Sequence, residues 1–336
     1  MSAALPLRQF ARNDPRIREL IYWVLSILDN NITSIEFASE DASFRRYFRI
    51  FHGDRSYIVM DAPVEHMSIE PFARISRKFI EHNINVPEIF AADFQKGFML
   101  ITDFGTTTYL QILNNSTADY LYDDALETLI RIQQATASDP EFLPPYDDSL
   151  LRTEMNLLPS WYLAKHLNLS LNARWTDVLE NTFDFLISKA LEQPKVWVHL
   201  DYHSRNLMYV DRRNPGVIDF QNAVLGPVTY DLMSLLRDVY IVWSEELVQK
   251  WIRLYLSKAD QAGLNLGCDE REFAQWFDLM GVQRHLKIAG IFSRLYYRDG
   301  KEQFLQSIPT TLQYIENVSN KHQELKQLHE LIKNLN

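Results

Sequence analysis

Residues 197–237 read WVHLDYHSRNLMYVDRRNPGVIDFQNAVLGPVTYDLMSLLR, and this stretch contains the polar side chains from which the fold can be inferred. Asp201 is followed five residues later by Asn206, and Asp219 lies at the end of a short apolar run. Phosphoryl transfer from a nucleotide requires a carboxylate that accepts a hydroxyl proton. It also requires oxygen ligands for Mg²⁺. The stretch therefore indicates that Asp201 is the proton acceptor and that Asn206 and Asp219 are metal ligands.

Two apolar segments flank a run of turn-forming residues between Asn206 and Asp219. Residues 207–210 and 217–220 are apolar, whereas DRRNPG between them is dense in residues that favour turns. This pattern predicts a β-hairpin. With the bend centred in the Arg212-Arg213 pair, Asn206 would lie opposite Asp219, and cross-strand neighbours are about 5 Å apart. Asp201 by itself could form only an Asx-turn, and Asp219 by itself could only cap a strand. These structural roles do not explain why Asp201, Asn206 and Asp219 occur together around a hairpin.

Composition limits the class of protein. The chain has 336 residues, of which 46% are hydrophobic, so it can build one large or two modest cores. A formal net charge of −10 without a Lys/Arg stripe disfavours nucleic acid as a partner. The single cysteine, Cys268, argues against a disulfide framework and fits a reducing cytoplasm. With neither a signal peptide nor an apolar run of transmembrane length, we expect a cytoplasmic protein with no membrane partner and no obligate protein partner.

The pattern of elements changes after the first hundred residues. The early part predicts an antiparallel sheet with strands at 34–39, 46–51, 56–60 and 98–102 and helices at 15–29 and 70–82. The later part has helical periodicity almost throughout. The helices expected there are 117–136, 150–167, 173–192, 228–243, 245–260, 270–297 and 310–334. We therefore expect a nucleotide-binding sheet lobe at 1–103, a larger helical lobe at 104–336 that carries the catalytic loop and the sugar site, and a ligand cleft where they meet.

Three motifs resemble those of the aminoglycoside phosphotransferase and choline kinase-like family. They are HLDYHSRN at 199–206, IDF at 218–220 and GPVTYDL at 226–232. The resemblance implies an α+β, bilobal protein-kinase-like fold with a small antiparallel-sheet N-terminal lobe and a mainly helical C-terminal lobe. Longer strings, such as DASFRRYFR at 41–49 and QRHLK at 283–287, are similar to bacterial kinases of cell-wall amino sugars. Such kinases use ATP to convert N-acetylmuramate and N-acetylglucosamine to their 1-phosphates in peptidoglycan recycling.

The resemblance also implies roles for single residues. Asp201 would be the catalytic carboxylate, Asn206 and Asp219 would bind Mg²⁺, and Asp231 would be a buried carboxylate that accepts hydrogen bonds from the backbone of the catalytic loop. The strand lysine that such folds use for the phosphates is missing from YIVMD at 57–61. The nucleotide would then contact Ser43, Arg45 or Arg46 with its phosphates, and Ile101 and Thr102 with its adenine.

The sugar is expected beside Asp201 in the helical lobe. Carboxylates, amides and aromatic rings commonly bind sugars, and a substrate carboxylate would favour an arginine. The candidates are Glu154, Tyr202, His203, Arg205, Asn222 and Arg284. Two alternatives remain open. One is a kinase for another small acceptor, such as an aminoglycoside or an amino alcohol. The other is an inactive kinase-like protein that only binds a nucleotide, which the missing lysine would favour.

Overall fold

The computed structural model describes residues 14–28, 32–40 and 45–335 of the chain. It divides into two compact units, and each is described by itself below. The first unit comprises Met1–Thr107 and Met208–Gln221, and the second comprises Thr108–Leu207 and Asn222–Asn336. The expected division into 1–103 and 104–336 is continuous, whereas the structure assigns the segment 208–221 to the first unit.

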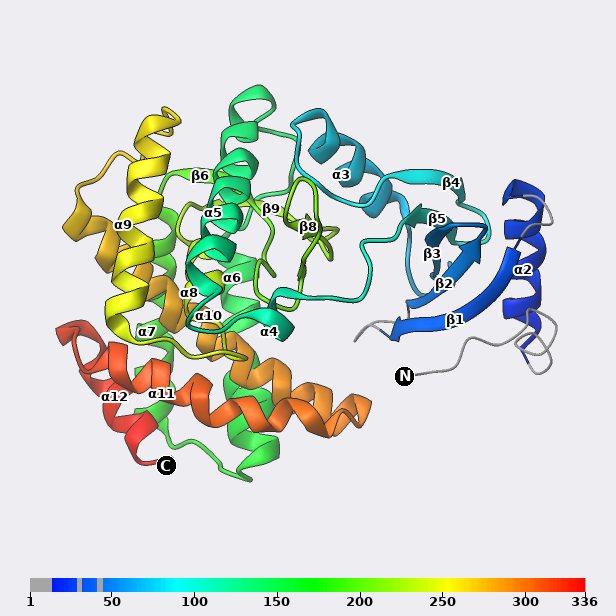
Figure 1. Cartoon of the computed structure of the whole chain (residues 1–336). Helices are drawn as coiled ribbons and strands as arrows, with labels where there is room; N and C mark the ends of the chain where they lie inside the picture. Colours follow the sequence, from blue (N-terminus) through cyan, green and yellow to red (C-terminus); the bar gives the residue numbers. More distant parts are fainter. Residues whose placement is uncertain (1–13, 29–31, 41–44, 336) are drawn as a thin grey trace. The chain divides into compact units, whose positions relative to one another are not determined.

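A five-stranded antiparallel sheet forms the centre of the first unit (Figure 1). The strand order is β1-β2-β3-β5-β4. The strands are β1 (Ile32–Glu40), β2 (Arg46–His52), β3 (Arg55–Asp61), β4 (Ile89–Asp93) and β5 (Phe98–Thr102). Gly53 has φ +57° in the tight turn that joins β2 to β3, a conformation that glycine adopts without strain. The predicted strands are thus all present, and three of them are one to three residues longer than expected.

The two faces of this sheet have different roles. Helix α2 (Pro15–Leu28) covers one face, where Leu20 and Val24 pack against Phe48, Val59 and Leu100. Burying a side chain of this kind stabilises the fold by about 1.5–3 kcal/mol. Successive residues of a strand point to opposite faces. The row of cross-strand partners at 49, 58 and 101 therefore lies on the face opposite α2.

The segment 208–221 is bound to the first unit by local contacts. The ring of Phe220 lies 4.7 Å from Phe72 and 5.8 Å from Phe79, centroid to centroid, and both belong to α3 (Glu70–Glu81). Val217 N donates to Asn85 O at 2.7 Å. The predicted hairpin is present as β7 (Leu207–Met208) and β8 (Gly216–Val217), but its strands are shorter than expected. The strands are short in part because the backbone N–H of Val217 bonds to Asn85 outside the hairpin and not to the neighbouring strand.

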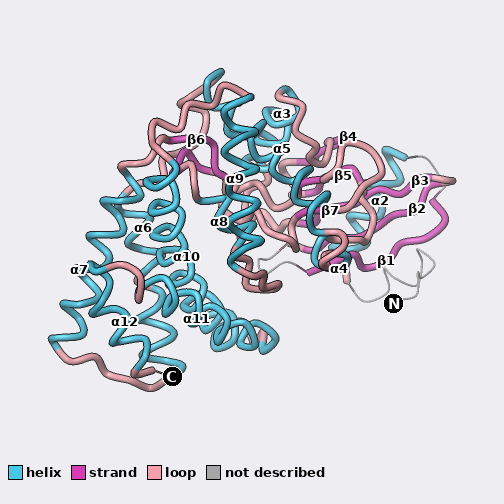
Figure 2. The backbone as a smooth tube through the Cα atoms, turned by 60° about the vertical axis from the view of Figure 1, so that its left-hand side comes forward, coloured by secondary structure: helices cyan, strands magenta, loops and turns pink. Residues whose placement is uncertain are grey.

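Helices make up most of the second unit, as Figure 2 shows. The 30-residue helix α10 (Glu270–Asp299) packs against most of the others. It begins at the N-cap Asp269, which accepts from Glu272 N, and ends at Gly300 in a left-handed conformation. A small antiparallel sheet of β6 (Lys195–Val198) and β9 (Val224–Pro227) lies beside these helices. The other helices are α4 (Tyr109–Ile112), α5 (Ala118–Ala135), α6 (Asp148–Met155), the π-helix η2 (Leu158–His166), α7 (Ala173–Leu191), α8 (Tyr230–Leu236), α9 (Glu245–Gln261), α11 (Ile308–Ser319) and α12 (Lys326–Lys333).

Three predicted helices differ from those observed. The helix expected at 150–167 is divided into α6 and η2, and Gly290 of α10 approaches the junction so closely that a Cβ there would lie 2.2 Å from the backbone of Leu157. The helix expected at 310–334 is divided into α11 and α12, because α12 turns back to bury Leu328 and Ile332 against α7 and α11. The helix expected at 228–243 ends at Leu236.

No helix among the described residues combines the length and the apolar character needed to cross a lipid bilayer.

Candidate active site

The loop between β6 and β7 carries the predicted catalytic residue, and a buried carboxylate holds its beginning. His199 N donates to Asp231 Oδ2 at 2.6 Å, and Leu200 N donates to Asp231 Oδ1 at 3.1 Å. Asp231 lies in the first turn of α8 and is only 1% exposed. Leu200 has φ +75°, a left-handed conformation that costs a leucine about 1–3 kcal/mol. The two hydrogen bonds offset this strain and present the next residue, Asp201, in a defined orientation.

A second buried carboxylate holds the other end of the loop. Asp238 Oδ2 accepts hydrogen bonds from both the backbone N–H and the hydroxyl of Ser204. Asn206 Nδ2 donates to Asp201 O at 3.0 Å, so this amide is also oriented by the loop itself. Asp238 is the second residue after α8, in LLRD at 235–238, and no local pattern in the sequence indicates its bond to Ser204.

Positive side chains of α10 set the charge state of Asp201. Burial alone would raise the pKa of Asp201, but the nearby charges of Lys287 and Arg284 hold it below its ordinary value. Arg284 Nη2 lies 3.8 Å from Asp201 Oδ1. The carboxylate is therefore ionised at neutral pH. Its side chain is 38% exposed, so it can contact a ligand and accept a proton.

Asp219 lies in the first unit, whereas Asp201 and Asn206 lie in the second. Asp219 has φ +65°, a left-handed conformation that short polar side chains tolerate better than most others. Gln221 Nε2 donates to Asp219 Oδ1, and the buried ring of Phe220 fixes the backbone between these two residues. Strained backbone therefore occurs at both ends of the motif, at Leu200 and at Asp219, and such strain is typical of functional sites.

The structure corrects the expectation that Arg46 contacts phosphate. Arg46 lies directly opposite Asp61 in the sheet, on the face that α2 covers. Its Nη2 is 2.6 Å from Asp61 Oδ2, and its Nη1 is 2.6 Å from Asp14 Oδ2. Burial would lower the pKa of Arg46, but the hydrogen bonds to these two carboxylates raise it. Arg46 therefore joins the beginning of α2 to the sheet.

The other predicted nucleotide contacts remain predictions. Arg45 directly precedes β2 and is only 5% exposed. Ile101 belongs to the row on the face opposite α2. Thr102 bonds to Glu88 through its backbone N–H and through its hydroxyl oxygen, so these groups stabilise the edge of the sheet. Ser43 lies outside the described residues.

Arg49, which no local sequence pattern marks as a site residue, organises the end of β5. Arg49 Nε lies 2.6 Å from Asp103 Oδ2, and Arg49 Nη2 donates to Gly105 O at 2.8 Å. The hydrogen bond that Arg49 donates to Asp103 raises the pKa of Arg49 more than burial lowers it. These contacts fix residues 103–105, which directly follow β5. Arg49 and Asp103 are 54 residues apart, so no local pattern pairs them.

Two of the predicted sugar-binding residues belong to a buried polar network in the second unit. Lys287 Nζ of α10 lies 2.8 Å from Glu154 Oε1 of α6 and donates to the Tyr230 hydroxyl at 3.1 Å. Tyr146 donates its hydroxyl to Glu154 Oε2. Burial would lower the pKa of Lys287, but the neighbouring Tyr230, Glu154 and Asp201 raise it. Glu154 and Arg284 are thus both joined to the surroundings of Asp201, and Lys287 is a site residue that the sequence analysis did not identify.

The remaining sugar-binding predictions have different outcomes. Tyr202 is 0% exposed and donates its hydroxyl to Ala125 O, so it is a core residue and the predicted sugar contact is corrected. The ring of His203 lies 5.6 Å from that of Tyr240, and burial lowers the pKa of His203. Arg205 is exposed beside the same ring, and Asn222 is exposed as well. For these last residues the sugar contact stays a prediction.

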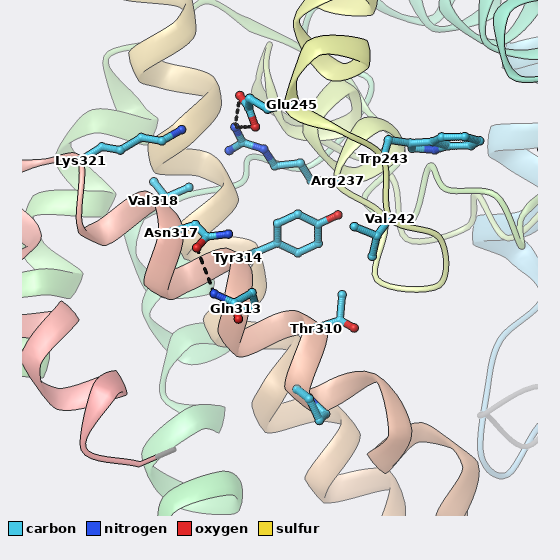
Figure 3. A pocket seen from close by; sticks show the side chains of 11 residues that line it. Arg237, Val242, Trp243, Glu245, Thr310, Gln313, Tyr314, Asn317, Val318 and Lys321 are labelled. Atoms are coloured by element: carbon cyan, nitrogen blue, oxygen red, sulfur yellow. Dashed lines mark hydrogen bonds and ion pairs between the residues drawn. The ribbon is translucent and has the colours of Figure 1, made fainter. Parts of the chain in front are cut away.

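A pocket of about 450 Å³ occurs elsewhere in the second unit (Figure 3). Arg237, Tyr314 and Lys321 are among the residues that line it, and none of the predicted site residues does so. Arg237 is paired with Glu245 at 3.2 Å and with Asp278 at 2.8 Å. We therefore place the candidate active site at the Asp201 loop and not in this pocket.

Comparisons with known proteins agree with this local geometry. The sequence profile of the phosphotransferase enzyme family matches residues 34–266. The chain is 44% identical over 302 residues to the N-acetylmuramate/N-acetylglucosamine kinase of Pseudomonas aeruginosa, covering 89% of this chain and 87% of that protein. It is 40% identical over 333 residues to the N-acetylmuramate/N-acetylglucosamine kinase of Pseudomonas putida, covering 96% of this chain and 97% of that protein.

A solved structure supports the fold. Choline kinase LicA from Streptococcus pneumoniae superposes with a TM-score of 0.64 at 12% sequence identity, covering 90% of this chain and 99% of that chain. This likeness shows the fold alone, and it confirms the predicted α+β, protein-kinase-like architecture. Because the family profile and the two relatives each match most of its length, the chain belongs to the phosphotransferase enzyme family.

Proposed function

We propose that this phosphotransferase is an ATP-dependent kinase that phosphorylates the anomeric hydroxyl of N-acetylmuramate or N-acetylglucosamine. The observation that carries the proposal is 44% and 40% identity, over most of the chain, to proteins named for these two substrates. The ionised Asp201, held in a strained loop by Asp231 and Asp238, supports the reaction type. We place the reaction in the cytoplasm, where ATP is available, and assign it to peptidoglycan recycling.

The mechanism assigns proton acceptance and positioning to the Asp201 loop. The sugar O1 forms a bond to the γ-phosphorus while the bond from that phosphorus to the bridging oxygen of ATP breaks and ADP leaves. Asp201 accepts the O1 proton late, because phosphoryl transition states are loose and positioning supplies most of the rate. The products are ADP and a sugar 1-phosphate. The C1–O1 bond is not broken, so the anomeric configuration is retained.

Asn206 and Asp219 suit a magnesium ion that accompanies the triphosphate. An amide oxygen and a carboxylate are the hard oxygen donors that Mg²⁺ prefers, and this ion takes its other ligands from phosphates and water. Along the chain, Asn206 directly precedes β7 and Asp219 follows β8 by two residues. When bound, the ion would neutralise charge on the leaving ADP.

The remaining roles follow from burial and charge. We assign the phosphates to Arg45 and Ser43, and the adenine to Ile101 and the backbone near Thr102. In the second unit, we assign sugar hydroxyls to Glu154, His203 and Asn222. Arg284 then acts mainly on Asp201, because the two side chains are already 3.8 Å apart.

A direct assay tests the proposal. Purified protein would be incubated with MgATP and either sugar, ADP formation would be followed, and phosphorus NMR would locate the phosphate on O1. The expected result is a sugar 1-phosphate from at least one of the two sugars. Asp201→Asn and Asp219→Asn should lower kcat at least about 10³-fold while circular dichroism stays unchanged. Turnover with an aminoglycoside or amino alcohol and with neither sugar would contradict the substrate assignment. Undiminished turnover by Asp201→Asn would contradict the mechanism.

A further inference from the structure

We infer that Arg205 determines whether the enzyme prefers an acidic acceptor sugar, by binding the carboxylate that N-acetylmuramate carries and N-acetylglucosamine lacks. The inference rests on the proposed function and extends it to substrate preference. The acidic group of N-acetylmuramate is a lactyl ether on O3. Carbons C1 and C3 both neighbour C2, so the reacting hydroxyl and the carboxylate are presented close together on one sugar.

The position of Arg205 in the chain matches this separation. Arg205 follows Asp201 by four residues in the same loop and directly precedes Asn206. The loop is fixed on both sides of Asp201, by Asp231 at its beginning and by the bonds from Ser204 to Asp238. Ser204 is the immediate neighbour of Arg205, so the Cα of Arg205 is fixed relative to the catalytic carboxylate. A guanidinium on this backbone can reach a group close to the reacting hydroxyl.

Aromatic rings hold the Arg205 side chain in place without neutralising it. The guanidinium carbon lies 4.7 Å from the centroid of the Tyr240 ring and 5.7 Å from that of Phe304. Phe292 contacts both rings, with centroid distances of 6.2 Å and 5.2 Å, so the platform is itself packed. Stacking restricts the arginine and lowers the entropy lost when it binds a ligand. Its planar fork remains suited to two parallel hydrogen bonds with a carboxylate.

Arg205 is a better candidate than Arg284 for binding a substrate carboxylate, because the two arginines differ in whether they already have a carboxylate partner. Arg284 is buried and lies beside Asp201, and Arg237 and Lys287 also have carboxylate partners. Arg205, in contrast, is exposed and has no carboxylate partner within the part of the chain that the structure describes. Its positive charge is therefore available to an acidic ligand, whereas the charge of Arg284 serves the catalytic aspartate.

The test compares two sugars and a neutral derivative. kcat/KM would be measured for N-acetylmuramate, its methyl ester and N-acetylglucosamine with the wild type, Arg205→Gln and Arg205→Lys. Arg205→Gln should lower kcat/KM for N-acetylmuramate about 10–100-fold, which is the loss expected for hydrogen bonds to a charged group, and should leave N-acetylglucosamine within about threefold. Arg205→Lys should retain part of the preference, because it keeps the charge but not the planar fork.

The methyl ester provides a readout that does not depend on a variant. The wild type should have a lower kcat/KM for the ester than for the free acid, whereas Arg205→Gln should have the same kcat/KM for both. The difference between these two ratios is the coupling energy of a double-mutant cycle between Arg205 and the substrate carboxylate. The matched control is Arg174→Gln, because Arg174 is also an exposed arginine, 4.8 Å from the Trp175 ring, but lies on α7. This control should change neither sugar's kcat/KM.

The outcomes separate the inference from the function on which it rests. If the wild type phosphorylates neither sugar, the proposed function fails. If it phosphorylates them but treats the acid and the ester alike, the inference is overturned even where a variant does not fold. An equal loss for both sugars in Arg205→Gln would also overturn it, because the arginine would then support catalysis in general and not the carboxylate.

Discussion

The substitution Asp231→Asn tests whether the buried carboxylate holds the catalytic loop. One oxygen of Asp231 accepts from His199 N and the other from Leu200 N, and the side chain is 1% exposed. An asparagine keeps one acceptor and turns an N–H₂ group toward the second donor, so one buried N–H group loses its partner. An unsatisfied buried donor costs about 1–3 kcal/mol. The left-handed conformation of Leu200 costs a similar amount, and fewer hydrogen bonds then remain to offset it. The loop can therefore relax to a less strained conformation.

The expected effect on activity is larger than the effect on stability. A shift of about 1 Å in a reacting group can lower the rate about 10²-fold, so kcat should fall by this factor while the KM for ATP changes little. Steady-state kinetics and urea unfolding would measure the two effects. Asp278→Asn is the control, because Asp278 is another largely buried aspartate of the second unit, but it pairs with Arg237 at 2.8 Å and does not contact the loop. A kcat for Asp231→Asn within about threefold of the wild type would refute this account of the loop.

The loss of stability caused by Asp231→Asn depends on pH. Burial raises the pKa of Asp231 to about 7, and the hydrogen bonds from His199 N and Leu200 N only partly oppose this. In the unfolded chain an aspartate titrates near about 3.9. A raised pKa in the folded state contributes stability that is fully present below about pH 4 and is lost as the pH rises through about 7. The free-energy difference between wild type and Asp231→Asn should therefore shrink from pH 4 to pH 7. A difference that grew over this range would contradict the assigned pKa.

Three further predictions concern the phosphates, the proton acceptor and the metal. Arg46→Met should lower the stability of the first unit by about 1–3 kcal/mol with little effect on the KM for ATP. Arg45→Met should instead raise the KM for ATP about tenfold. Thermal unfolding and steady-state kinetics measure these effects, and a raised KM for ATP in Arg46→Met but not in Arg45→Met would contradict the assignment. Lys287→Met removes a charge that lowers the pKa of Asp201, so the acid limb of the kcat/KM profile should move to higher pH, and an unmoved limb would contradict this. Chelation by EDTA should stop turnover, added Mg²⁺ should restore it, and Asn206→Ala should require more Mg²⁺; equal Mg²⁺ titrations for variant and wild type would argue against Asn206 as a ligand.

Several features of the site could be predicted because they are encoded locally. The positions of Asp201 and Asn206 in the loop after β6, and the hairpin that precedes Asp219, follow from alternation and turn-forming residues within about twenty residues of chain. The helical periodicity beyond residue 106 likewise reflects neighbours three and four residues apart. Short-range signals of this kind are present in the sequence whatever the rest of the chain does.

Other features required the register of the sheet. Arg45 and Arg46 looked equivalent in the sequence, but strand alternation places Arg46 opposite Asp61 on the face that α2 covers. The alternation is visible in the sequence, whereas the identity of the covered face is not. Tyr202 similarly looked like a sugar ligand until burial showed it to be part of the core.

The sequence alone determined the type of chemistry, because the residues that perform it lie close together along the chain and their spacing indicates their roles. Only the tertiary structure decided which side chains position and charge that site. Asp238 meets Ser204 across 34 residues, and Lys287 of α10 meets Glu154 of α6. The physical reason is that helix packing selects such partners, so the pKa of Asp201 depends on charges that the backbone brings together from distant parts of the sequence.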